Sequence, residues 1–143
     1  MSTGAMSDLS LEARIRRLED IESIKQLKAR YAAACDDDYN ANALAKLFTE
    51  DAIWDGGPMG CHKGQDAIRQ FFSVSDQVVP FAIHHVTNPI IEITVDRATG
   101  QWGICGNRAP LPRATRLCGW AQPTTMCIGV APKAGCSRTS LSC

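Results

Sequence analysis

The chain changes character immediately after Trp102, and this change limits how much regular structure the sequence can support. Of the 15 Asp and Glu residues, none lies in residues 103–143, although five basic residues do. The same stretch holds five of the 7 Cys and four of the 7 Pro. Because proline lacks the backbone N–H that a central strand needs, we expect residues 103–143 to be irregular. We therefore expect this tail not to complete a sheet.

Composition excludes several classes of protein. A chain of 143 residues is long enough for one domain with a real core. The net charge of +0 and the pI of about 6.8 do not favour binding to nucleic acid or to an anionic membrane. The sequence has neither a membrane-spanning apolar run nor a signal peptide, so we expect a cytoplasmic protein. The odd number of cysteines gives little support to a secreted, disulfide-bonded fold.

The first 102 residues show regular periodicity. Residues 1–9 are expected to be a disordered leader, and Ser10 is a candidate N-cap. Apolar residues then recur at spacings of three and four, which predicts a long amphipathic helix that ends at Asp36–Asp38, with a break near Asp20 as an alternative. The residues of this apolar stripe are Leu11, Ile15, Leu18, Ile21, Ile24, Leu27 and Tyr31.

The remaining predicted elements alternate between helices and strands. They are a helix at 42–48, a strand at 52–54 with a hairpin partner at 60–62, a helix starting at 63–66, a long strand at 81–95, a turn at 96–100 and a returning strand at 101–102. This order predicts an α+β fold with helices on one face of a curved, mostly antiparallel sheet. The predicted core includes Leu18, Ile21, Leu27, Leu47, Phe48, Phe71 and Ile91.

Four short stretches carry a resemblance to a known family. They are DIESIKQLKARY at 20–31, with Asp36 beyond it, LFTEDAIW at 47–54, KGQDAI at 63–68 and HHVTNPIIEI at 84–93. In this order and spacing, residues 10–102 resemble the SnoaL-like branch of the nuclear-transport-factor-2-like superfamily. Within it the chain is similar to scytalone dehydratase, bile acid 7α-dehydratase and hexachlorocyclohexane dehydrochlorinase.

The resemblance implies both a fold and a chemistry. The fold is a cone-shaped α+β barrel that holds an apolar ligand at its open end, often in a homodimer or homotrimer. The chemistry is proton abstraction with loss of a leaving group, without a metal or other cofactor, on a hydrophobic substrate such as a steroid-like or polyketide-like molecule. This implies a lyase of the dehydratase type, or an isomerase. The alternative is a non-catalytic module of the same fold that binds a small ligand or forms a dimer.

The resemblance also implies the site residues. By position, His84 is the general base, Asp36 orients and charges it, and Tyr31 is a third catalytic candidate. A neutral imidazole can accept a proton near neutral pH, and a carboxylate on its other nitrogen stabilises the imidazolium. Tyr31 could donate a hydrogen bond to a leaving oxygen or to a substrate carbonyl.

Each candidate residue also has a structural interpretation. Without the resemblance, Asp36 is a solvated loop residue and Tyr31 is a core residue on the apolar stripe. His84 and His85 are neighbours on a strand and point to opposite faces, and we expect His84 to face inward. Trp54 and Asn88 are the substrate-binding candidates, with core packing as the alternative for Trp54. His62 is expected at the surface, and no metal site is predicted because no ligand pairs have the required spacing.

A shifted reading frame offers one explanation for the tail. Read from the third base of each codon after Trp102, with permitted codons chosen, the stretch at 122–129 can give ADDDVYRR and the stretch at 132–136 can give EGWLF. These are the alternating strand and the turn that the resemblance implies. We therefore predict that residues 103–143 arise from a frameshift near codon 103, and that the chain as written has an impaired fold and activity. A natural, divergent tail is the alternative.

Overall fold

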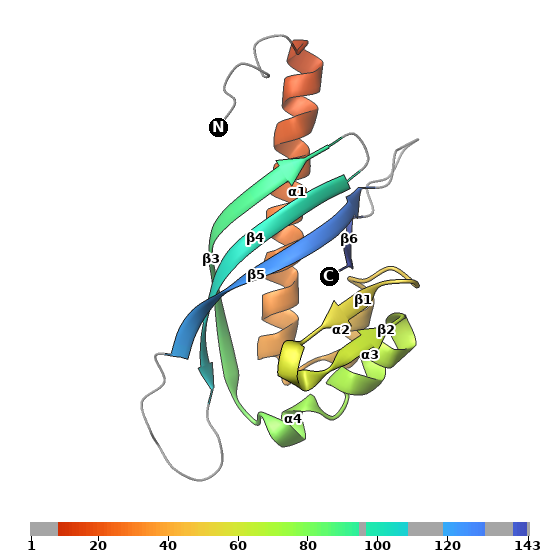
Figure 1. Cartoon of the computed structure of the whole chain (residues 1–143), viewed down its shortest axis with the longest axis vertical. Coiled ribbons are helices and arrows are strands. Elements are labelled where there is room, and N and C mark those ends of the chain that lie inside the picture. The colour runs from red at the N-terminus through yellow and green to blue at the C-terminus, as the bar shows by residue number, and fades with distance from the viewer. Residues whose placement is uncertain (1–8, 95–96, 109–118, 131–138, 143) are drawn as a thin grey trace.

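The chain forms an α+β fold with two antiparallel sheets (Figure 1). The computed structural model describes residues 9–94, 97–108, 119–130 and 139–142, with side chains described as far as Gly103. The helices are α1 (Leu11–Asp36), α2 (Ala41–Ala45), α3 (Gln65–Phe72) and α4 (Ser75–Val78). The strands are β1 (Ile53–Asp55), β2 (Cys61–Lys63), β3 (Ala82–Ile93), β4 (Arg97–Arg108), β5 (Gly119–Val130) and β6 (Thr139–Ser142). The predicted fold class is confirmed.

Helix α1 is one continuous element of 26 residues, so the alternative break near Asp20 does not occur. Ser10 caps its start, as predicted, because the Ser10 hydroxyl accepts a hydrogen bond from the Ala13 N–H at 3.2 Å. The helix ends at Asp36. The chain then reverses through Asp38 and Tyr39, whose φ angles of 47° and 52° lie in the left-handed region.

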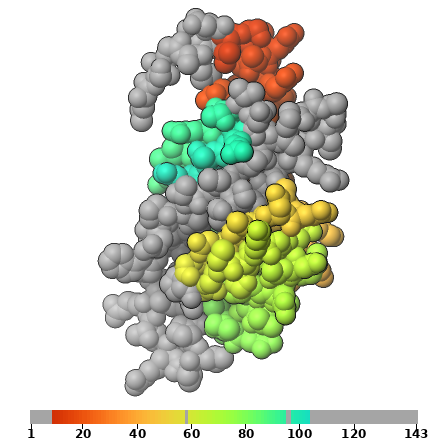
Figure 2. Space-filling model, turned by 45° about the vertical axis from the view of Figure 1, so that its right-hand side comes forward, coloured from red at the N-terminus to blue at the C-terminus, as the bar shows by residue number. Residues whose placement is uncertain are grey.

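The two halves of α1 differ in burial. Ile24 is 1% exposed and Leu27 is 2% exposed, but Leu18 is 59% exposed, so the prediction that Leu18 lies in the core is wrong. The reason is geometric, because the first turns of α1 extend beyond the sheet and form one end of the molecule (Figures 1 and 2). Among the other predicted core residues, Phe48 is buried, whereas Ile21, Leu47, Phe71 and Ile91 are half-buried.

A small hairpin and the short helices form a second unit beside α1. Strands β1 and β2 pair antiparallel with Trp54 opposite His62, which confirms the predicted hairpin. A single 3₁₀ turn, Gly57–Met59, joins them. Gly64 has a φ of 86°, a value that glycine adopts without strain, and α3 starts at the next residue. Helix α4 was not predicted, since its four residues show no periodicity.

The larger sheet has the strand order β3-β4-β5-β6, with every neighbouring pair antiparallel. Strand β4 already begins at Arg97, so the predictions of a turn over 96–100 and of a returning strand from 101 place the start of this strand too late. Thr94 closes this turn, because both its N–H and its hydroxyl donate to the Arg97 carbonyl at 2.8 and 2.9 Å. The pairing of β3 with β4 shifts register between Thr87 and Ile90, where Asn88 has a φ of 51°.

The expectation that residues 103–143 form no strands is wrong. Strand β4 continues to Arg108, and β5 and β6 lie wholly beyond Trp102. Pro123 is accommodated within β5 at a position that β6 leaves unpaired, because β6 pairs only with Cys127–Val130. Proline is tolerated where one side of a strand has no partner. The expectation for residues 109–118, 131–138 and 143 lies outside the described residues.

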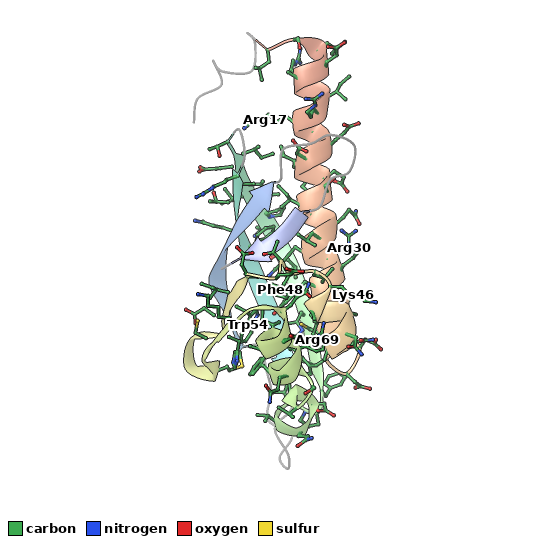
Figure 3. The ribbon with its side chains drawn as sticks, turned by 90° about the vertical axis from the view of Figure 1, so that its right-hand side faces the viewer. Arg17, Arg30, Lys46, Phe48, Trp54 and Arg69 are labelled. Carbon is green, nitrogen blue, oxygen red and sulfur yellow. The ribbon has the colours of Figure 1, made fainter. Side chains whose placement is uncertain are left out.

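The hydrophobic core lies between the second half of α1, the β1–β2 hairpin, α3 and the larger sheet. Figure 3 shows Phe48 and Trp54 in this interior, with Arg30 and Lys46 on the outer side, away from the larger sheet. Within the described part of the chain, no helix is both long and apolar enough to cross a membrane. Deeply buried residues of the described chain include Ile24, Leu27, Cys35, Leu44, Ala45, Phe48, Ala52, Ile68, Phe72, Ala98 and Trp102.

Candidate functional site

The last residue of α1 meets strand β3 through a paired carboxylate and imidazole. The Asp36 Oδ1 atom lies 2.7 Å from His84 Nδ1, and the two side chains are 29% and 25% exposed. The His84 backbone N–H also donates to both Asp36 oxygens, at 3.0 and 3.1 Å. The carboxylate therefore holds both the ring and the backbone of His84.

This arrangement fixes the chemistry of the imidazole. When Nδ1–H donates to the carboxylate, Nε2 carries the lone pair and can accept a proton. Asp36 stands at the C-terminal end of α1, where the helix dipole disfavours a negative charge. The hydrogen bonds from His84 offset that cost, and a protonated ring would offset it further. The geometry therefore leaves Nε2 as the ring atom that can accept a proton from a substrate.

The orientation of the two neighbouring histidines follows from the strand. His84 is half-buried and paired with Asp36, whereas His85 is exposed. Alternation along β3 separates them to opposite faces. The structure thus brings together His84 and Asp36, 48 residues apart in the sequence.

Tyr31 is half-buried and packs against the hydrophobic core. Its hydroxyl accepts a hydrogen bond from Trp54 Nε1 at 2.9 Å and is also hydrogen-bonded to the Cys35 thiol. Its ring packs edge-on against Phe48 and Phe72, with centroids 6.1 and 6.3 Å apart. These contacts explain why Tyr31 continues the apolar stripe of α1.

Tyr39 is a site residue that sequence reasoning missed. Its ring stacks on Phe72 at 6.2 Å and meets the His84 ring edge-on at 6.5 Å, so it bridges the core to the imidazole. A bulky residue with a positive φ is an outlier that often marks a functional site. The only signal in the sequence is an aromatic residue immediately after the three aspartates.

The other predicted residues lie apart from the pair. Trp54 is 8% exposed and packs against Phe71 at 4.7 Å, which supports its interpretation as a core residue. Asn88 is exposed at the register shift in β3. His62, which was predicted at the surface, is half-buried, and its ring stacks on Phe71 at 4.3 Å. Among the described residues, no three His, Cys, Asp or Glu side chains are grouped to hold a metal.

Cys35, the residue before Asp36, is a buried thiol whose pKa is shifted by its surroundings. Burial raises the pKa of the Cys35 thiol to about 12, and the hydrogen bond from Tyr31 and the charge of Lys28 lower it against that effect. Asp36 raises the pKa of Cys35 further. The thiol is therefore protonated at neutral pH and is not a nucleophile.

Comparison with solved structures agrees with the fold. A protein from Novosphingobium aromaticivorans assigned as a scytalone dehydratase is 17% identical, with a TM-score of 0.69 over 88% of this chain and 81% of that one. Hexachlorocyclohexane dehydrochlorinase LinA-type3 from Novosphingobium barchaimii is 19% identical, with a TM-score of 0.66 over 90% and 88% of the two chains. A third, from N. aromaticivorans and assigned as an aromatic ring hydroxylase, is 22% identical, with a TM-score of 0.64 over 87% and 89%.

These likenesses establish the fold alone, since the assigned activities differ and every identity is low. Among curated proteins, no sequence matches this chain significantly. A family model described as the SnoaL-like domain does match, over residues 16–121. That match covers most of the chain, including α1 from residue 16 onward, both strands of the hairpin, and strands β3 and β4. The chain therefore belongs to the SnoaL-like domain family.

Proposed function

We propose that this protein is a cofactor-independent lyase that removes a proton and a leaving group from a hydrophobic small molecule. The observation that carries the proposal is the His84–Asp36 pair. His84 Nδ1 lies 2.7 Å from Asp36 Oδ1, and the His84 backbone N–H donates a hydrogen bond to the same carboxylate. A residue that only packs has no need of such an arrangement. Steroid-like and polyketide-like alcohols with a carbonyl β to the hydroxyl are the substrate class that we favour.

The reaction follows from the two nitrogens of the ring. Nε2 of His84 takes the proton next to the carbonyl, and the electron pair of that C–H bond forms the new C=C bond. The C–O bond breaks, and its electrons leave with the oxygen. Asp36 stabilises the imidazolium that forms, as a carboxylate does in hydrolase triads. Tyr31 is the proposed donor of the proton that converts the departing oxygen into water.

One observation favours a second function. The Tyr31 hydroxyl is engaged by Trp54 and Cys35, which is what a purely structural tyrosine would show. If Tyr31 only packs, the same fold serves as a binding module for an apolar ligand. A homodimer or homotrimer is compatible with either function, and we propose it on the basis of the family.

The test compares three variants on a panel of hydrophobic β-hydroxy ketones, with the absorbance of the unsaturated product as the readout. His84→Ala should lower the rate by about 10²–10⁴-fold, the usual contribution of a general base. Asp36→Asn should lower the rate while the protein stays folded. His85→Ala is the matched control and should retain full activity, because His85 is exposed on the opposite face.

The outcomes separate the two functions. Turnover that depends on His84 supports the lyase. Tight binding of an apolar ligand without turnover, unaffected by His84→Ala, would instead support the binding module.

A further inference from the structure

Lys28 is a buried cation that the proposed reaction does not yet use. Its side chain is 2% exposed and is one of the largest fully buried side chains in the described part of the chain. Lysine is almost never fully buried unless its charge is compensated. Lys28 lies on the face of α1 that packs against the core, one turn before Tyr31.

Two aromatic rings hold the ammonium. Lys28 Nζ lies 4.7 Å from the centroid of the Tyr31 ring and 5.6 Å from the ring of Trp102 on β4. A cation over an aromatic face is attracted by the ring quadrupole, and more strongly when water is excluded. Lys28 is 2% exposed and Trp102 is 3% exposed, so water is excluded from the Trp102 side of this arrangement, while Tyr31 is half-buried. These contacts favour the charged form of Lys28 against the cost of burial.

The charge of Lys28 acts on its neighbours. It lowers the pKa of Cys35, which lies seven residues further along α1, and Tyr31 is hydrogen-bonded to that same thiol. The Lys28 ammonium lies 4.7 Å from the centroid of the Tyr31 ring. The Tyr31 oxygen also accepts a hydrogen bond from the Trp54 N–H. A nearby cation and a hydrogen-bond donor both stabilise a phenolate over a phenol.

We propose that Lys28 is a positioning residue that acts through Tyr31: its buried ammonium stabilises negative charge on the Tyr31 oxygen and so makes Tyr31 a proton donor. This inference rests on the lyase proposed above. In the elimination, the Tyr31 O–H bond breaks and its proton passes to the departing oxygen, which leaves as water. Lys28 compensates the phenolate that remains until the proton held by His84 is returned through solvent.

Among the described residues, the titratable side chains in contact with Tyr31 lie on helix α1: Lys28 over its ring and Cys35 bonded to its hydroxyl. Asp36 acts on Cys35, and it is paired with His84 of strand β3. The hairpin and α3 contribute Trp54 and Phe72, which do not titrate. Within the part of the chain whose side chains are described, Lys28 is the cation placed against the ring, so its removal should change the ionisation of Tyr31.

The experiment uses the full chain and needs no substrate. The chain has 2 tyrosines, so a Tyr39→Phe background leaves Tyr31 as its single phenol. The phenolate absorbance is titrated with alkali, while circular dichroism confirms the fold at each pH. Lys28→Met should move the Tyr31 titration upward by about one pH unit or more. Lys28→Arg, which keeps the charge, should move it far less.

Lys25→Met is the matched control. Lys25 lies on the same helix, but its side chain is 45% exposed and is placed near Glu22, so its loss should leave the Tyr31 titration unchanged. An equal titration in Lys28→Met and in the background would overturn the inference, even where His84→Ala abolishes turnover. A failure of the lyase assay, conversely, leaves the titration result standing and removes only the role in catalysis.

A second measurement covers the case in which Lys28→Met does not fold. The ¹⁵N chemical shift of lysine Nζ distinguishes an ammonium from an amine, and the Lys28 signal can be assigned by its absence in Lys28→Arg. We expect an ammonium at neutral pH in the unaltered protein. A neutral amine at that pH contradicts the proposal directly, because an uncharged Lys28 cannot stabilise a phenolate.

Discussion

Gly100 is the position at which one added methyl group should disturb the core most. A Cβ built on Gly100 would lie 2.1 Å from Cη2 and 2.3 Å from Cζ3 of Trp102, which is far inside van der Waals contact. Trp102 is 3% exposed, so its indole has little room to move. Gly100→Ala should therefore displace the ring that also holds the Lys28 ammonium.

The expected cost follows from two opposing effects. Overpacking a core costs about 1–3 kcal/mol, and replacing glycine by alanine regains about 0.4–1 kcal/mol through the unfolded chain. The net loss of unfolding free energy should be about 1–2 kcal/mol. For a chain of this size it corresponds to a fall in melting temperature of roughly 3–7 °C.

The assay is thermal and urea unfolding of a double-mutant cycle. Trp102→Leu removes the indole that the new Cβ would meet, so Gly100→Ala should cost little in that background. The difference between the two backgrounds measures the clash itself. If Gly100→Ala is neutral in the unaltered chain, or costs the same with and without Trp102, the packing argument is refuted.

Three further outcomes are expected. Cys61 is exposed and Cys35 is buried with its pKa raised to about 12, so peptide mapping after iodoacetamide treatment at pH 8 should show Cys61 modified and Cys35 protected; equal modification would contradict this. Asp38→Gly should stabilise the fold by about 0.5–1 kcal/mol in urea unfolding, because glycine relieves the strained φ of 47°, and a loss of stability would count against strain at this turn. Trp54→Phe should cost about 1 kcal/mol or more, since it removes the hydrogen bond to Tyr31; an unchanged unfolding midpoint would show that this bond contributes nothing.

Much of the fold could be predicted where local chemistry determines it. The Ser10 cap, the end of α1 at Asp36 and the pairing of Trp54 with His62 all follow from residue type and spacing. The exposure of Leu18 could not be predicted, because periodicity identifies a face of a helix but not how far the sheet reaches along it.

The candidate site shows a different limit. The pairing of Asp36 with His84 spans 48 residues and came from resemblance, since no local rule connects two residues so far apart. Tyr39 was missed because its place depends on a left-handed turn that many sequences avoid. Lys28 was missed because lysine is usually exposed, although its place four residues after Ile24 and three before Tyr31 puts it on the buried face of α1.

The tail shows that proline content alone is a weak guide to strands. Strand β5 contains Pro123 and still pairs with β4, because the restriction on proline depends on which edge of a strand is occupied. Strand β5 also spans the codons that a shifted frame reads as ADDDVYRR. The frameshift stays a prediction, and resequencing the gene across codon 103 tests it.

The register shift in β3 has a consequence for the phase of the whole strand. From Thr87 to Ile90 the strand advances three residues while β4 advances two, from Gly103 to Gln101, so β3 carries one extra residue. That insertion inverts the alternation: even-numbered His84 and Val86 turn inward before it, and odd-numbered Ile91 and Ile93 after it. Deleting Asn88 would restore strict alternation with all four side chains still inward; a strand that kept Asn88 but paired without the extra residue could hold either its imidazole or its two isoleucines inside, but not both.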